Sequence, residues 1–117
     1  MARYVIDRQE NFPPGTRRAF DAGGRSVAVF NRGDRFFALR NICPHHGAPL
    51  CTHELRGTMT ASKPQEYEYV MEGEIVRCPW HGYEYTVQDG RCLTDPDAYR
   101  VKVYRIEVED DDVVLYT

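Results

Sequence analysis

Hydrophobic positions in this chain fall into short runs rich in β-branched and aromatic residues, and turn sequences separate the runs. The signals Pro-Pro-Gly, Gly-Gly and Arg-Gly-Asp divide the N-terminal runs, and such punctuated runs are typical of β-strands. We find no helical periodicity longer than about one turn. The pattern predicts an all-β fold, an antiparallel sandwich or small barrel, with two consecutive hairpins across residues 24–34. The predicted strands are 3–7, 16–22, 25–31, 35–40, 73–78, 82–88, 99–109 and 112–117.

The stretch from residue 56 to residue 73, RGTMTASKPQEYEYVMEG, has a different composition. Small polar residues dominate its first half, and it contains one proline and two tyrosines. Such a composition predicts a long surface loop that leads into a hairpin.

Two short segments share one pattern of cysteine, proline, histidine and glycine. The first is NICPHHGAPLC at residues 41–51, and the second is CPWHG at residues 78–82. One residue separates Cys43 from His45, and two residues separate Cys78 from His81. Each cysteine follows a strand-like run, so the tips of two hairpins can bring the loops face to face. The segments therefore predict a metal site with two thiolate and two imidazole ligands.

A set of two cysteines and two histidines suits two kinds of metal centre. Zinc would take all four ligands tetrahedrally in a structural site. A [2Fe–2S] cluster would divide them, with both cysteines on one iron and both histidines on the other. Zinc knuckles usually supply two cysteines from one loop, whereas each loop here supplies one cysteine and one histidine. The matched loops favour the cluster, and zinc stays open as an alternative.

Composition narrows the class of protein further. The chain has 117 residues, a formal net charge of −3 and four cysteines, a length typical of one domain. Its scattered lysines and arginines argue against a nucleic-acid-binding face, and the acidic segment 107–112 is expected to be a solvated turn. It has no apolar run of membrane-spanning length and no signal-like N-terminus. We expect a single cytoplasmic domain, 1–117, in which Cys51 and Cys92 are ordinary thiols rather than a disulfide.

The segments CPHHGAPL and CPWHG resemble the paired cluster-binding motifs of Rieske iron–sulfur proteins, C-x-H-x-G-x-x-L and C-x-x-H-G. The flanks, from about residue 3 to residue 116, are similar as well. The resemblance implies a Rieske-type antiparallel β-sandwich with a cluster-binding subdomain of two hairpin loops, at about residues 41–97. It also implies one [2Fe–2S] cluster, with Cys43 and Cys78 on the inner iron and His45 and His81 on the outer iron.

Further residues are expected beside the cluster rather than on it. The C-x-H spacing selects His45 as the ligand and leaves His46 as a neighbour. The resemblance implies that Tyr83 replaces the serine of high-potential relatives, which predicts a low reduction potential. Tyr85 stands where those relatives have a tyrosine that bonds a cysteine sulfur, so it either lifts the potential slightly or only packs the sheet. The expected neighbours are His46, Gly47, Trp80, Gly82, Tyr83, Tyr85 and Pro96.

Departures from the motifs select a branch of the Rieske family. Members from cytochrome complexes carry an extra cysteine in each loop, and Ala48 and Trp80 stand at those positions here. Terminal oxygenases carry a second domain with a catalytic iron, for which this length leaves no room. We therefore expect an electron carrier rather than an enzyme, a stand-alone ferredoxin that passes electrons from a flavin-dependent reductase to a terminal oxygenase. A small subunit of a nitrite reductase or another multi-component oxidoreductase, and a zinc-binding interaction module, stay as alternatives.

The spacing between the loops departs from the family. Stand-alone ferredoxins typically have far fewer residues there than the stretch 46–77 of this chain. The extra residues, about 58–72, are expected to form an inserted loop or an extended hairpin beside the cluster. Such an insertion either selects the partner or is simply tolerated.

Overall fold

The computed structural model describes residues 2–44, 47–52, 54–63, 66–80 and 82–117. A short 3-10 helix, η1 (Gln9–Asn11), follows the first strand, and no helix in these ranges is long and apolar enough to cross a membrane. Every run predicted as a strand overlaps a strand of the structure, so the all-β prediction is confirmed. The strands are β1 (Arg3–Arg8), β2 (Arg17–Ala22), β3 (Arg25–Asn31), β4 (Phe36–Arg40), β5 (Arg56–Lys63), β6 (Glu66–Arg77), β7 (Glu84–Thr86), β8 (Val103–Glu109) and β9 (Asp112–Tyr116).

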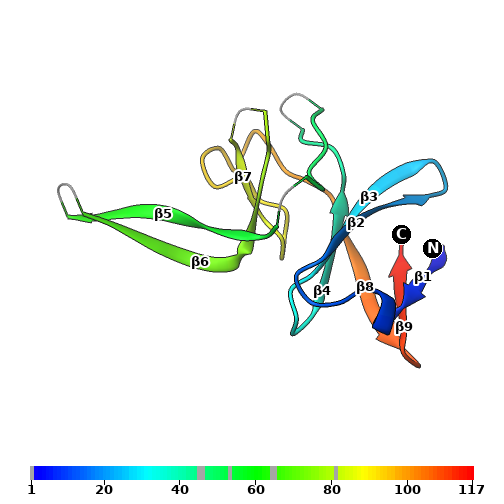
Figure 1. The fold of residues 1–117 in the computed structure, drawn as a ribbon. Helices are drawn as coiled ribbons and strands as arrows, with labels where there is room; N and C mark the ends of the chain where they lie inside the picture. Colours follow the sequence, from blue (N-terminus) through cyan, green and yellow to red (C-terminus); the bar gives the residue numbers. More distant parts are fainter. Residues whose placement is uncertain (1, 45–46, 53, 64–65, 81) are drawn as a thin grey trace.

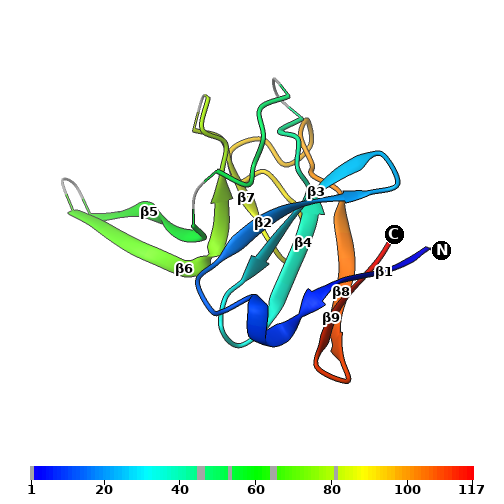
Figure 2. The same cartoon turned by 45° about the vertical axis from the view of Figure 1, so that its right-hand side comes forward.

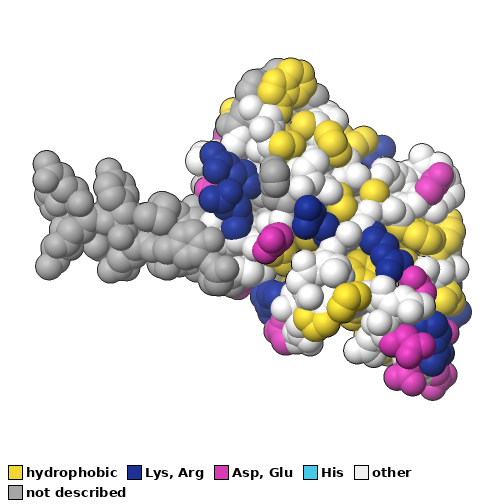
Figure 3. Space-filling model, viewed as in Figure 1, with side chains coloured by type: hydrophobic (Ala, Val, Ile, Leu, Met, Phe, Trp, Pro, Cys, Tyr) yellow, Lys and Arg dark blue, Asp and Glu magenta, His cyan; other side chains and the backbone are white. Residues whose placement is uncertain are grey.

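The strands form two antiparallel sheets (Figures 1 and 2). The larger sheet has the order β1-β9-β8-β4-β3-β2, and the smaller has the order β5-β6-β7. Both predicted hairpins, β2–β3 and β3–β4, are present. The β8–β9 hairpin turns at Asp110 and Asp111, which are exposed and have positive φ. Acidic side chains gather at that end of the molecule (Figure 3), which confirms the expected solvated acidic turn.

β3 and β4 are buried on both faces, and each face packs into a different core. Because alternate residues of a strand point to opposite sides, a continuous apolar run can serve two cores at once. The first core takes Ala28, Phe30, Phe37 and Leu39 from these strands, and the second takes Val27, Val29, Phe36 and Ala38. Cys43 and Cys78 lie in the first core. The β3–β4 hairpin therefore forms a wall between the two cores, and the cysteine-bearing loops rest on one side of it.

The prediction of a long loop at residues 56–73 was wrong, and the alternative of an extended hairpin is what forms. β5 pairs with β6 over most of this stretch, and the hairpin projects from the body (Figure 1). The register shifts between Arg56 and Thr58, where β6 contains Gly73 with a φ of 75°. The strands were missed because small and polar residues fill β5, and these give little of the hydrophobic signal by which strands are recognised.

A matched pair of glycine substitutions tests how the loop after β7 is held. Gly90 and Gly24 both have positive φ, so alanine at either position costs about 1–2 kcal/mol. A Cβ at Gly90 would also lie 1.9 Å from the carbonyl oxygen of Val101, whereas a Cβ at Gly24 would meet nothing within 4 Å. We expect Gly90→Ala to lower the melting temperature clearly more than Gly24→Ala, measured by calorimetry. Equal shifts would show that the Gly90–Val101 contact is not tight.

Candidate metal centre

The first loop begins where β4 ends, and Asn41 holds its two ends together. The side-chain oxygen of Asn41 accepts hydrogen bonds from the backbone N–H groups of Leu50 and Cys51, both at 2.8 Å. Its amide nitrogen donates to the hydroxyl of Ser26 at 3.1 Å. These bonds tie residue 41 to residues 50 and 51, and they anchor the loop to β3.

The two cysteine loops have the same backbone turn. In the first, the N–H of Cys43 donates to the carbonyl of Ala48 at 2.7 Å, and the N–H of Gly47 donates to the carbonyl of Cys43 at 2.7 Å. In the second, Cys78 donates to the carbonyl of Tyr83 at 2.7 Å, and Gly82 donates to the carbonyl of Cys78 at 3.0 Å. The donors and acceptors stand at the same offsets from the cysteine in both loops. The matched sequence pattern therefore folds into matched geometry.

The two turn glycines are required by the backbone they adopt. Gly47 has a φ of 78° and Gly82 a φ of 73°, a region that other residues enter only at a cost. A Cβ at Gly82 would also lie 2.8 Å from a guanidinium nitrogen of Arg77. At Gly82, the missing side chain therefore also leaves room for the cationic side chain of Arg77.

The sulfur atoms of both loops converge on one buried region. Cys43 and Cys78 are fully buried in the same core cluster, which also contains Tyr85 and Leu50. The hydroxyl of Tyr85 lies 3.2 Å from the Sγ of Cys43. Burial, and then the hydrogen bond to Cys43, raise the pKa of Tyr85 far above its ordinary value. The phenol therefore keeps its proton and can donate it toward a thiolate. This is the contact that the first of the two alternatives for Tyr85 requires, and its effect on the potential stays a prediction.

The donors in the described residues fit a cluster that takes two thiolates. Cys43 and Cys78 form no disulfide and lie together in the core. A buried thiolate is costly unless a metal or hydrogen-bond donors compensate its charge, and Tyr85 supplies one such donor. His45, His46 and His81 lie outside the described residues, and within the described ranges no group of three or more metal-ligating side chains occurs. The thiol half of the predicted ligand set is therefore present and suitably buried.

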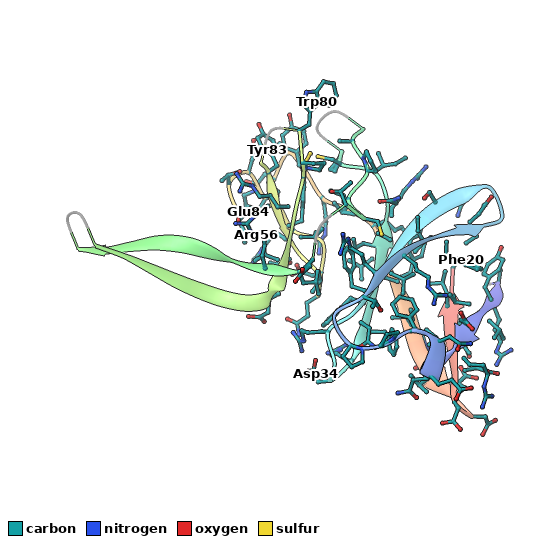
Figure 4. The ribbon with its side chains drawn as sticks, in the orientation of Figure 1. Phe20, Asp34, Arg56, Trp80, Tyr83 and Glu84 are labelled. Atoms are coloured by element: carbon teal, nitrogen blue, oxygen red, sulfur yellow. The ribbon has the colours of Figure 1, made fainter. Side chains whose placement is uncertain are left out.

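The remaining predicted neighbours lie around the loop tips. Trp80 is 61% exposed at the tip of the second loop (Figure 4), and hydrophobic side chains gather at that end of the molecule (Figure 3). Tyr83 is half-buried, with its ring centroid 5.5 Å from that of Tyr99. Pro96 is exposed in the loop after β7. The second loop thus presents an aromatic residue to solvent at its tip and holds its sulfur inside.

Cys51 and Cys92 are both free, so the prediction that they form no disulfide is confirmed. Burial raises the pKa of the Cys51 thiol, and the charge of Arg17 opposes that rise. Cys92 is buried, with its sulfur 3.5 Å from the hydroxyl of Thr94. The raised pKa of Cys51 is the opposite of the depressed pKa that marks a reactive cysteine.

Sequence reasoning missed Asn41 and Arg77. Asn41 was visible as the polar residue that opens the first motif segment, and its role depends on a loop closure that no residue pattern shows. Arg77 precedes Cys78 directly, yet only the turn brings its guanidinium over Gly82. A cation there favours negative charge in the second loop.

Removing the Asn41 side chain should loosen the first loop. Asn41→Ala leaves the buried N–H of Leu50 and the part-buried N–H of Cys51 without their acceptor, at about 1–3 kcal/mol for the buried group and less for the other. We expect a lower melting temperature and faster hydrogen exchange at these two amides. Asn11→Ala is the control, because the exposed side chain of Asn11 donates to Asp7 in an exposed hydrogen bond, and it should change stability by less than about 0.5 kcal/mol. Equal effects of the two substitutions would contradict the role given to Asn41.

Comparisons with known proteins agree with this geometry. Residues 2–105 match the family model of the Rieske [2Fe-2S] domain. The ferredoxin CarAc of Metapseudomonas resinovorans is 29% identical over 103 residues, covering 87% of this chain and 81% of that protein. The ferredoxin subunit of biphenyl dioxygenase from Pseudomonas sp. strain KKS102 is 28% identical over 106 residues, covering 91% and 84%.

A solved structure gives the same result for the fold. The complex of reduced oxygenase and oxidised ferredoxin in carbazole 1,9a-dioxygenase contains a chain that superposes with a TM-score of 0.72 at 25% identity. The match covers 97% of this chain and 91% of the other. The predicted Rieske-type antiparallel fold is confirmed. This chain belongs to the Rieske [2Fe–2S] domain family, and its cofactor is a Rieske-type [2Fe–2S] cluster.

Proposed function

We propose that this protein is a cytoplasmic electron carrier that takes single electrons from a flavin-dependent reductase and delivers them to a terminal oxygenase. The observation that carries the proposal is the pair of matched turns, each of which places a buried cysteine thiol in one core. The relatives support the partner class, because one of the two ferredoxins is named as a subunit of biphenyl dioxygenase and the similar solved chain comes from a complex with an oxygenase.

Cys43 and Cys78 are the proposed ligands of one iron, and His45 and His81 are the proposed ligands of the other. The exposure of the flanking residues supports this division. Both cysteines are fully buried, whereas Pro44 and Trp80, one residue before each histidine, are exposed. Ligands placed in these tip segments would lie at the surface, where a partner protein can approach. The histidine end is therefore the proposed exit for the electron.

The cluster supplies reversible uptake of one electron, at a potential raised by its histidine ligands. The residues around the cysteine loops determine the hydrogen bonding, the access of water and the charge near the cluster. Tyr85 donates a hydrogen bond toward the Cys43 sulfur and so stabilises added negative charge there. Leu50 and Val87 belong to the same buried core and exclude water from the cysteine side. Arg77, beside Gly82, places a positive charge near the second loop.

Removing the Tyr85 hydroxyl should lower the reduction potential. The hydrogen bond to Cys43 favours the more negative, reduced state, and a hydrogen bond of this kind contributes about 1 kcal/mol. For a one-electron couple this corresponds to a fall of several tens of millivolts in Tyr85→Phe. Tyr104→Phe is the control, because Tyr104 is equally aromatic but lies in the second core. Spectroelectrochemical titration measures the potential of each protein. If Tyr85→Phe has the same potential as the unchanged protein, Tyr85 only packs the core.

Voltammetry tests the carrier function without requiring the natural partners. The purified protein should give a reversible one-electron wave that persists through repeated cycles. Cys78→Ser should abolish the wave and the visible absorption, because it removes a proposed ligand. Cys51→Ser should keep both, because Cys51 is a free thiol outside the proposed ligand set. A coloured protein that shows no wave, or a wave that survives Cys78→Ser unchanged, would overturn the proposal.

A further inference from the structure

The two cysteine loops differ in charge although their backbone turns are matched. Gly47 and Gly82 each donate to the carbonyl of the cysteine in their own loop. The residue directly before the cysteine is Ile42 in the first loop and Arg77 in the second, and both side chains are exposed. The second loop therefore carries a cation at the position where the first loop has an apolar residue.

The side chain of Arg77 folds back across the second turn. A Cβ at Gly82 would lie 2.8 Å from a terminal nitrogen of the guanidinium, 3.1 Å from its Nε and 3.4 Å from its Cζ. A Cβ at Gly47, the matching position of the first loop, would meet nothing within 4 Å. Gly82 directly follows His81 in the sequence. The guanidinium is thus held against the turn, beside a proposed iron ligand.

No ion pair within the described residues cancels the charge of Arg77. The ion pairs found there join other residues. Glu84 is opposite Arg77 in the pairing of β6 with β7, and the charge of Asp95 acts on Tyr83. These carboxylates place negative charge near the second loop, and the Arg77 cation opposes it. Basic side chains gather over β7 and the last part of β6 (Figure 3).

Reduction of the cluster adds one electron, and therefore one negative charge, between the two loops. A nearby cation favours the more negative state. We propose that Arg77 is a charge-compensating residue of the redox site, which raises the reduction potential and attracts an anionic group of the redox partner to the second loop. An arginine keeps its proton in both redox states. The electron is therefore the only charge that moves.

The attraction would give the docked partner a preferred orientation. Arg77 and the exposed Trp80 belong to the same loop. A carboxylate of the partner matches the planar fork of the guanidinium, whereas Ile42 offers the first loop no such contact. The partner would therefore turn an acidic group toward the second loop. This part of the inference rests on the proposed electron-carrier function, and the effect on the potential requires only the cluster.

Spectroelectrochemical titration of Arg77→Gln tests the effect on the cluster. Glutamine keeps a polar side chain and removes the charge. At an applied potential equal to the midpoint of the unchanged protein, the ratio of reduced to oxidised protein should fall roughly two- to fivefold. For one electron a tenfold fall corresponds to about 59 mV. Arg77→Lys keeps the charge and should restore most of the ratio. In about 1 M salt the fall should shrink, because salt screens an exposed charge.

Arg35→Gln is the matched control, because it removes one positive charge from another exposed arginine. Arg35 directly follows Asp34, which lies at the opposite end of the molecule from Trp80 (Figure 4). The ratio of reduced to oxidised protein should stay nearly unchanged in this variant, since charges further apart than a Debye length are largely screened. Circular dichroism and the visible spectrum show whether each variant keeps its fold and its cluster.

Two small oxidants of opposite charge test the attraction without the natural partner. Stopped-flow mixing measures how fast the reduced protein passes one electron to hexacyanoferrate(III), which becomes hexacyanoferrate(II), and to hexaamminecobalt(III), which becomes cobalt(II). At low salt, Arg77→Gln should lower the ratio of the first rate to the second at least about threefold. The ratio removes the change in driving force that both reactions share. Arg35→Gln should leave this ratio nearly unchanged.

Each of four outcomes would contradict the role given to Arg77. An unchanged potential in Arg77→Gln would show that the neighbouring carboxylates and solvent already cancel the charge. Equal losses in Arg77→Gln and Arg77→Lys would make the side chain a structural strap of the turn. Equal shifts in Arg77→Gln and Arg35→Gln would assign the effect to net charge, and an unchanged ratio of rates would remove the attraction. In all four the protein keeps a reversible wave, whereas failure of the carrier function is the loss of that wave.

Discussion

β3 and β4 are buried on both faces, and this two-sided burial determines where the other strands and the cysteine loops can pack. Their apolar runs leave no face for solvent, so each strand must be covered twice. One cover is the second core, built with β9 and Phe12. The other is the core that holds Cys43 and Cys78. The thiols are buried because they help to cover a hydrophobic wall, and the first loop is anchored because it emerges directly from β4.

Because of the matched turns, the site has a buried end at the cysteines and an exposed end at the loop tips. Each turn fixes its cysteine with one donated and one accepted backbone hydrogen bond, so the sulfur side lies in the core. The tip of the second loop, at Trp80, lies in solvent. A cofactor held across such a boundary has one half shielded from water and one half near a partner. This arrangement suits electron transfer, since shielding tunes the potential and exposure shortens the path.

The sequence predicted the burial of the two cysteine loops better than it predicted the β5–β6 hairpin, for physical reasons. The cysteine motifs contain residue types that few other structures require at that spacing, so Cys43 and Cys78 could be singled out from the local pattern. The Tyr85 contact was expected only from the family resemblance, as one of two alternatives. Asn41 and Arg77 were missed because their contacts depend on how a turn closes. β5 was missed because threonine, alanine and serine carry little hydrophobic signal, and its pairing with β6 becomes visible only through the register.

The presence of a Rieske-type [2Fe–2S] cluster is tested most directly by two measurements on the purified protein. These are its iron, zinc and sulfide content, and its electron paramagnetic resonance spectrum before and after reduction with dithionite. We expect a coloured protein with about two irons and two acid-labile sulfides per chain, as for a [2Fe–2S] cluster. The reduced protein should give a signal with a lower average g value than an all-cysteine cluster, because two ligands are histidines. A colourless protein that retains zinc after iron-replete, anaerobic preparation would contradict both the [2Fe–2S] cluster and the proposed electron transfer.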